Sequence, residues 1–379
     1  MRNLPFERPA PFGPTPVHDE LRRTGPIARV VTADGQPAWV IVGAALARRV
    51  LSDARFTMAP PGTPEGPASL LSDGAPHARL RRLLSRAFTP RNLERLRPAI
   101  TTLAGELVAE LRERGPGSDL VSIVGRPLPL GVTSHMLGIN VTDRERFYAW
   151  ADAASGITGG GEGFEQAWGE LTAYFPSLIA AKRADPGPDL LSEVIAVRDA
   201  EDGRLSDDEL FTTAISLVFG GYLTVANTLS IGVVHLGEAG GLARIDDVPT
   251  AVEEMLRYSA GLHGEAFARY AQTDIDLDGV RLAAGDQVLV RLEAANQDPD
   301  LIPDPARFDP ARTPNPHLAF GHGPHHCIGA ALGRMELVAV VGALAEQLPG
   351  LRLACAPEDV PWTGNPLDNG PASLPVTWS

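Results

Sequence analysis

Lysine and cysteine are scarce in this sequence. Lys182 is the only lysine among 379 residues, while arginine, alanine, glycine and proline are abundant. That bias is typical of a GC-rich bacterial genome. Cysteine occurs only as Cys327 and Cys355. The two could pair in principle, but we expect a chain without an export signal to keep both thiols reduced.

Membrane spans and a signal peptide are also missing from the pattern. No apolar run reaches the length of about 18 residues that a membrane span needs. The start, Met1–Pro9, lacks the apolar core of a signal peptide. We therefore expect a soluble, cytoplasmic protein. The formal net charge of −14 argues against nucleic acid as a partner.

A linker between domains is absent as well. The length would allow about two or three domains, but no stretch has the composition of a linker. Hydrophobic residues make up 44% of the chain, enough for a sizeable core. We expect one domain over residues 1–379, acting as a monomer.

Periodicity and turn residues predict a chain of helices with a smaller β part. Two strands at 27–31 and 38–42 flank a hairpin turn at Asp34-Gly35. Helices are expected over residues 44–51, from 77 onward, from 101 to 156 with breaks near 127–129 and at 138, and over 166–184, 206–236, 251–259 and 330–347. A proline-rich loop covers 58–76, a glycine-rich loop 156–163, and a final strand 373–379.

The stretch Phe320–Gly329 is built around Cys327. Gly323 and Gly329 flank the cysteine, and a helical run follows at once. Glycines let the chain pass close to a flat ligand where a Cβ would clash. Backbone amides and the positive end of the helix dipole are expected to lower the pKa of the cysteine. A lone cysteine is more often a small buried hydrophobe, but this arrangement suits an axial metal ligand.

The spacing of Phe320, Gly323, His325, Cys327 and Gly329 resembles the haem-binding signature of the cytochrome P-450 family. The resemblance implies haem b (iron protoporphyrin IX), with Cys327 as the iron ligand, the aromatic side chain packed beside it and His325 at a haem propionate. It also implies a mostly α fold with a smaller β region. The haem would lie between the long central helix and the helix that follows the cysteine.

An arginine-rich segment precedes the middle of the chain. Between 79 and 97 a single acid, Glu94, accompanies seven arginines, at positions 79, 81, 82, 86, 91, 95 and 97. A solvated helix face is one interpretation, and a partner surface is the other. The resemblance matches His77 and Arg81 to propionate-binding positions. The remaining arginines would then face an acidic ferredoxin.

The long central helix carries the second group of candidate residues. Ser206 and Glu209 form a capping-box pattern at its start. Gly220 and Gly221 cost about 1 kcal/mol each inside a helix, so they serve either close packing or, as the resemblance implies, a kink that makes room for oxygen. Thr224 keeps the family's hydroxyl. Leu223 stands where the family usually has an acid, which leaves the source of distal protons open.

Further matches follow in the family's order. Glu254 and Arg257 would ordinarily form a surface bridge, whereas the resemblance implies that they lock against the loop before the cysteine, near Phe308 and Arg312. Arg269 matches a third propionate position. Two departures accompany these matches: Gly261 replaces a frequent proline, and the 58–76 loop is short. The short loop suggests an open distal pocket.

The resemblance implies an oxidoreductase that uses O₂ and two electrons from ferredoxin and ferredoxin reductase, and the short 58–76 loop suggests a bulky secondary metabolite as its substrate. Cys327 would donate electron density to the O–O bond, and Thr224 would hold a water or the distal oxygen. Because Leu223 cannot relay protons, we expect the substrate's own polar groups and ordered water to help. Two alternatives stay open: oxidative aryl cross-linking without oxygen insertion, and a haem-bearing recruitment or sensing module without chemistry.

Overall fold

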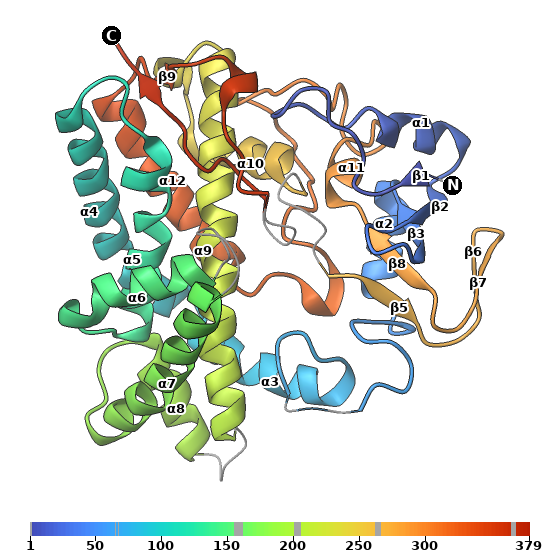
Figure 1. Ribbon diagram of the computed structural model, residues 1–379, viewed down its shortest axis with the longest axis horizontal. Helices are drawn as coiled ribbons and strands as arrows, with labels where there is room; N and C mark the ends of the chain where they lie inside the picture. Colours follow the sequence, from blue (N-terminus) through green and yellow to red (C-terminus); the bar gives the residue numbers. More distant parts are fainter. Residues whose placement is uncertain are drawn as a thin grey trace.

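Helices fill one side of the molecule and strands gather on the other (Figure 1). A computed structural model describes residues 2–64, 66, 68–154, 162–200, 206–261, 267–364 and 369–379. The prediction of a mostly helical fold with a smaller β region is confirmed. Most of the glycine-rich segment 156–163, expected to be a loop, lies outside the described residues.

The helical side is built around α9. Its helices are α4 Pro90–Arg114, the π-helical turn η1 Val121–Gly125, α5 Pro127–Leu137, α6 Val141–Ala154, α7 Glu162–Ala184, α8 Leu190–Ala200, α9 Asp207–Glu238, α10 Val248–Ser259 and α12 Ala330–Gln347. Four helices lie nearer the sheet or below it: α1 Val17–Thr24, α2 Ala44–Ser52, α3 Gly74–Ala87 and α11 Leu292–Asn296. Single 3-10 turns are η2 Leu242–Arg244, η3 Gly323–His325 and η4 Pro357–Asp359.

The main sheet has six strands. In spatial order they are β1 Arg2–Asn3, β2 Ile27–Val31, β3 Pro37–Ile41, β8 Gln287–Val290, β5 Arg269–Ala271 and β4 Phe56–Thr57. The predicted hairpin is confirmed: β2 and β3 are antiparallel with Ile27 opposite Ile41, and Gly35 takes the positive φ of 82° that the turn requires. Two small antiparallel pairs complete the β part: β6 Ile275–Leu277 with β7 Val280–Leu282, and β9 Arg352–Leu353 with β10 Val376–Thr377.

Helix α9 begins at the predicted capping box. The Glu209 amide donates to Ser206 Oγ at 3.1 Å, and the Ser206 amide donates to Glu209 Oε2 at 2.8 Å. The helix has 32 residues and is long and apolar enough to cross a membrane, so the expectation that no run reaches that length was wrong. However, 67% of its most apolar window is buried inside the protein. That burial is typical of the core helix of a soluble protein.

Prolines explain two wrong helix boundaries. Helix α3 begins at Gly74 rather than near His77, and α10 begins at Val248 rather than Ala251. Pro76 and Pro249 lie in the first turns of these helices, where a missing N–H costs no hydrogen bond. The final strand is also shorter than expected, since only Val376–Thr377 pairs with β9.

A buried charge cluster joins α10 to the segment that leads to Cys327. Glu254 and Arg257 have fully buried side chains and form a two-pronged ion pair, with both N···O distances 2.7 Å. Arg312 donates to the same carboxylate at 3.1 Å. Arg257 also donates to the carbonyl oxygens of Asn296 and Pro305, at 3.0 and 2.8 Å. The predicted lock is therefore present, and the surface-bridge interpretation was wrong.

Replacing Glu254 by glutamine should leave two guanidinium groups buried without a counter-charge. We expect Glu254→Gln to lower the free energy of unfolding by about 3–5 kcal/mol, the usual cost of breaking a buried pair. Urea denaturation measures this. Glu20→Gln is the matched control, because Glu20 pairs with Arg2 where both side chains are about half exposed, and such pairs contribute at most about 1 kcal/mol. Equal losses in the two variants would contradict a special role for the cluster.

Candidate active site

The Cys327 loop is held by its own backbone and by α2. The Cys327 amide donates to the Phe320 carbonyl at 2.9 Å. Gly321 and Gly323 have φ of 72° and 73°, values that favour glycine. A Cβ on Gly323 would clash with the Leu51 carbonyl. Gly323 is therefore required by contact with protein, whereas the sequence had suggested only a nearby flat ligand.

Cys327 offers its sulfur at the surface of this loop. Its side chain is exposed, yet the protein around it raises the pKa of the thiol by desolvation, against the Gly329 backbone and the guanidiniums of Arg81 and Arg334. The backbone at Gly329 and the two guanidiniums lower the pKa of the thiol as expected, but desolvation by the surrounding protein outweighs them, so the net shift is upward. A bound metal cation would restore the thiolate.

A metal at Cys327 must bring most of its ligands with it. Among the residues that the structure describes, no group of three or more His, Cys, Asp or Glu side chains is arranged to hold a metal ion. A single sulfur ligand suits a metal that is already bound in a macrocycle, as iron is in haem.

The loop is braced from α10 and α12. Arg334 donates to Glu253 at 2.6 and 2.9 Å, and His317 Nε2 lies 2.9 Å from the same carboxylate. Burial opposes ionisation of Glu253, but these hydrogen bonds prevail and lower its pKa to about 2. The Arg334 guanidinium also lies 4.5 Å from the centre of the Phe320 ring. The Phe320 ring therefore packs against Arg334, and Glu253 holds the Arg334 guanidinium in place.

The four predicted propionate ligands lie close to this loop. His77 and His325 stack with ring centres 4.1 Å apart, and Arg81 donates to the carbonyl of His326. Burial, with help from His325 and Arg81, lowers the pKa of His77 to about 4. Arg269 is buried, its guanidinium donates to the Phe267 carbonyl at 3.0 Å, and desolvation lowers its pKa.

These groups still have capacity for anions. His77 is 3% exposed, and its Nε2 atom is buried without a hydrogen-bond partner. Arg81 and Arg269 donate hydrogen bonds to backbone carbonyl oxygens, which are neutral acceptors and carry no charge of their own. Two carboxylates would supply both the missing acceptor and the missing charge. The cluster therefore fits the two propionates of haem.

Asp73, at the start of α3, links this cluster and was missed by sequence reasoning. Its carboxylate lies 3.2 Å from His325 Nε2 and accepts from the Met58 amide at 2.8 Å. It also acts electrostatically on His77 and Arg269. The only signal in the sequence was an acid four residues before His77, which an isolated helix cap explains equally well.

Thr224, Gly220 and Gly221 lie on α9, the second element that carries candidate residues. Thr224 is exposed and donates to the Gly220 carbonyl at 2.9 Å. A Cβ on Gly220 would meet nothing within 4 Å, and one on Gly221 would make only an ordinary 3.6 Å contact with Thr133 Oγ1. Close helix packing therefore does not explain Gly220. Leu223 is buried at 8% exposure in the core.

Helix α9 meets the cysteine loop just beyond Thr224. A Cβ on Gly333 would lie 3.9 Å from Val225 Cγ2 and 4.0 Å from the Phe320 ring. Thr224 is therefore next to a residue that packs close to the start of α12 and the aromatic residue of the loop. The structure brings together both groups of candidate residues that the sequence placed about a hundred positions apart.

The arginine-rich segment does not form one free basic face. Arg79 donates to Glu209 on α9, Arg95 pairs with Glu193 on α8, and Arg97 pairs with Glu94. Arg82 and Arg91 are exposed. The expectation that all remaining arginines face a partner was therefore too broad, since several serve helix–helix contacts.

Departures from the family pattern have structural reasons. Gly261 has a φ of 80°, which proline cannot adopt. A Cβ there would also lie 2.7 Å from the backbone nitrogen of Glu293 on α11. Gly261 is thus fixed by backbone geometry and close packing.

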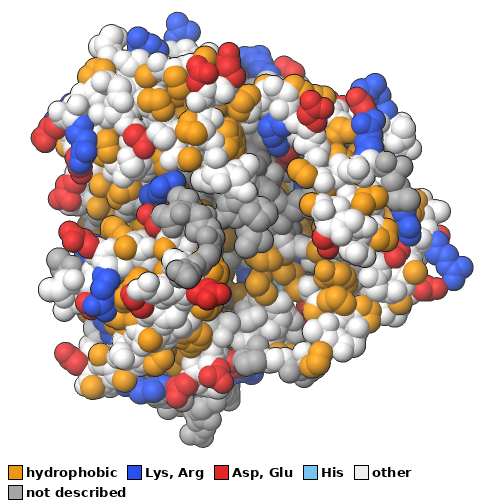
Figure 2. All heavy atoms as spheres, viewed as in Figure 1, with side chains coloured by type: hydrophobic (Ala, Val, Ile, Leu, Met, Phe, Trp, Pro, Cys, Tyr) orange, Lys and Arg blue, Asp and Glu red, His pale blue; other side chains and the backbone are white. Residues whose placement is uncertain are grey.

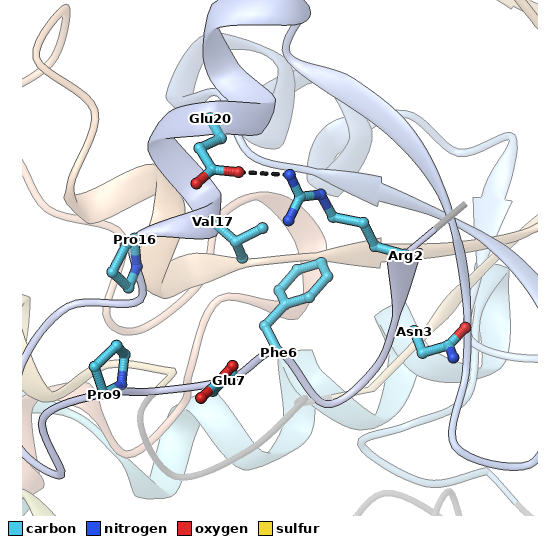
Figure 3. A pocket seen from close by; sticks show the side chains of 8 residues that line it. All are labelled: Arg2, Asn3, Phe6, Glu7, Pro9, Pro16, Val17 and Glu20. Atoms are coloured by element: carbon cyan, nitrogen blue, oxygen red, sulfur yellow. Dashed lines mark hydrogen bonds and ion pairs between the residues drawn. The ribbon is translucent and has the colours of Figure 1, made fainter.

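A separate hollow at the N-terminal edge lacks comparable chemistry. It is lined by Phe6 and by the exposed ion pair of Arg2 with Glu20, with no histidine or cysteine (Figure 3). In Figure 2, charged side chains of both signs are scattered around the outer parts of one face, with hydrophobic side chains spread between them. The cysteine loop and α9 therefore remain the better candidate site.

Comparisons with known proteins agree with this geometry. A family model described as Cytochrome P450 matches residues 242–349. Mycinamicin IV hydroxylase/epoxidase of Micromonospora griseorubida is 39% identical over 95% of this chain and 94% of its own. Nocardicin C N-oxygenase of Nocardia uniformis subsp. tsuyamanensis is 39% identical over 100% and 98%.

Solved structures extend the similarity to the fold. The crystal structure of CYP105P1 in complex with filipin I has a TM-score of 0.91 and 34% identity, covering 100% of this chain and 99% of that one. The predicted haem cofactor and oxidoreductase class follow from such relatives. A non-catalytic module is not supported. Similarity of this extent, together with the cysteine loop and its cationic cluster, shows that the chain belongs to the cytochrome P450 family of haem-dependent monooxygenases.

Proposed function

We propose that the protein oxidises a bulky secondary metabolite, with O₂ and two electrons delivered by ferredoxin and ferredoxin reductase. The observation that carries this proposal is the exposed Cys327 sulfur beside an unsatisfied cationic cluster, with Thr224 on the adjoining helix. The names of two relatives, a mycinamicin IV hydroxylase/epoxidase and a nocardicin C N-oxygenase, support a natural-product substrate.

Each candidate residue receives a role in this proposal. When bound, haem supplies the redox chemistry that activates dioxygen. Cys327 Sγ ligates the iron, and Phe320, Gly323 and Gly329 shape the loop that presents the sulfur. The propionates are held by His77, Arg81, Arg269 and His325.

The distal residues position oxygen and protons. Gly220 and Gly221 leave room beside α9, since neither position is tightly packed. Thr224 Oγ1 donates to Gly220 in the protein alone and would pass a proton at that oxygen during turnover. In this proposal the protein acts as a cytoplasmic monomer with one domain. The 44% of hydrophobic residues is enough for the core of such a domain.

Oxidative aryl cross-linking is the second candidate, favoured by exposed aromatic side chains near α9. Phe164 and Trp168 on α7 are each 39% exposed and stack nearly in parallel, with ring centres 6.4 Å apart. Trp168 also lies 5.6 Å from Phe219, the residue before Gly220. Such surfaces bind aromatic rings well. Product masses distinguish the reactions: hydroxylation adds one oxygen atom, whereas coupling removes two hydrogens.

Replacing the proposed iron ligand should abolish the thiolate signature. We expect the ferrous carbon-monoxide complex of the native protein to show the red-shifted Soret band of thiolate-bound haem, and Cys327→Ser to lose it. Absorbance spectra of the purified proteins check this. Cys355→Ser is the control, since Cys355 is a partly buried free cysteine elsewhere in the fold. Loss of the band in Cys355→Ser and its retention in Cys327→Ser would mean that the ligand is wrongly assigned.

Reversing the charge of Arg82 should slow reduction by ferredoxin. Arg82 is exposed on α3 next to Arg81, which contacts the cysteine loop. Because attraction between charged surfaces is screened by salt, Arg82→Glu should reduce the rate about tenfold at low salt and weaken its salt dependence. Stopped-flow reduction measures both.

The control for this surface is Arg29→Glu. Arg29 is a similarly exposed arginine on β2, where its guanidinium lies over the Trp39 ring. We expect this variant to be reduced at the native rate. Peroxide-driven turnover should be spared in both variants, because it bypasses ferredoxin. An equal loss of peroxide-driven turnover in Arg82→Glu would indicate a folding defect instead.

A further inference from the structure

A line of polar positions runs along one face of α9 toward Thr224. Glu209, Thr213, Ser216, Gly220 and Thr224 are spaced by four, three, four and four residues, which places them on one face of a helix. We call these five positions the polar stripe. The rest of α9 is mostly apolar, with buried residues along most of its length. A polar stripe inside such a helix needs a reason.

The middle of the stripe contains an unsatisfied hydroxyl. Thr213 is 3% exposed, and its Oγ1 atom is buried without a hydrogen-bond partner. Leaving a buried hydroxyl unpaired costs about 1–3 kcal/mol. A valine of the same shape would avoid that cost. A bound water is the usual partner of such a group.

The rest of the stripe provides room and further acceptors. A side chain at Gly220 would meet nothing within 4 Å, so waters fit beside the helix there. Ser216 Oγ donates to the Thr212 carbonyl at 2.7 Å, and Thr224 Oγ1 donates to the Gly220 carbonyl at 2.9 Å. Both hydroxyl oxygens still have lone pairs to accept from water.

The stripe begins near solvent, at the ion pair between Glu209 and Arg79. Glu209 is 7% exposed and is held by Arg79 from α3, whose side chain is 33% exposed. From Glu209 to Thr224 the helix rises about 22 Å. Hydroxyls four residues apart are separated by about 6 Å, a distance that one water spans. The longer step past Gly220 needs about three waters.

We propose that the polar stripe carries protons from solvent at Glu209 to Thr224 and so replaces the acid that is missing at Leu223. Each oxygen accepts a proton from one side and passes its own to the next, so one proton enters at the Glu209 end and one leaves at Thr224 Oγ1. No electron moves along the stripe. Thr213 and Ser216 position the waters and relay protons with them, but neither is placed at the reacting oxygen, so they are not catalytic residues. This proposal rests on the proposed monooxygenase function.

The test uses the haem-loaded enzyme with its reductase system and the variants Thr213→Val and Ser216→Ala. Slower proton delivery should increase the share of electrons released as peroxide and lower product formation about tenfold, less than the loss from removing a positioned acid or base. The solvent deuterium isotope effect should rise. Because the stripe acts in series, the double variant should cost no more than the worse single variant.

Thr212→Val is the matched control. Thr212 is the neighbouring residue on α9, and its hydroxyl donates to the Asp208 carbonyl at 2.7 Å outside the stripe. It should behave as the native enzyme does. A diffraction experiment gives a readout without turnover: ordered waters should lie at Thr213 Oγ1 and beside Gly220, and Thr213→Val should lose the first of them.

Three outcomes would overturn the stripe. One is that peroxide release and the isotope effect stay unchanged in Thr213→Val and Ser216→Ala. That result is expected if the substrate supplies the protons. Another is an equal effect of Thr212→Val, which would indicate a structural cause. The third is a Thr213 Oγ1 without water. None of these outcomes contradicts the proposed function. The proposed function has its own test and fails if Cys327→Ser keeps the thiolate spectrum.

Discussion

The burial of one carboxylate constrains how this chain presents its cysteine. Glu254 has no exposed surface and is surrounded by Arg257 and Arg312, with the Asp309 amide donating to it at 2.9 Å. An ionised group in that position is tolerated only when its partners are all in place. Arg257 shares α10 with Glu254, whereas Asp309 and Arg312 belong to the segment after α11, which leads directly to Phe320 and Cys327. The cluster therefore constrains the path of the chain that enters the loop.

A second constraint is the group of two arginines and two histidines next to that loop. His77, His325, Arg81 and Arg269 lie together with Asp73 as the carboxylate that links them. Burial lowers the pKa of both histidines and so disfavours their charged forms, and His77 Nε2 has no hydrogen-bond partner among the described residues. Two propionates would relieve this condition. In the proposed function, haem binding would therefore supply the acceptor that His77 lacks.

Helix α9 combines two demands that usually exclude each other. Its C-terminal half is buried as a core helix, from Val225 to Leu236. Its N-terminal half carries hydroxyls, a buried glutamate and an open glycine position on one face. Leu223 is buried at the position where the family usually has an acid, and the polar side chains of this half of the helix lie on other turns. The helix thus supports the core and lines the site at once.

Local spacing and the family resemblance predicted the fold class, the capping box of α9 and the hairpin at Gly35, and they singled out Cys327 as the proposed iron ligand, because these depend on patterns along single segments. The family pattern also predicted the Glu254–Arg257 lock. Only the tertiary structure decided that Asp73 joins the cationic cluster, that Arg79 serves Glu209, that burial outweighs the amides at Cys327 and that Thr213 lacks a partner. Each of these depends on desolvation or on contacts between segments far apart in the chain, and neither can be read from spacing along one segment.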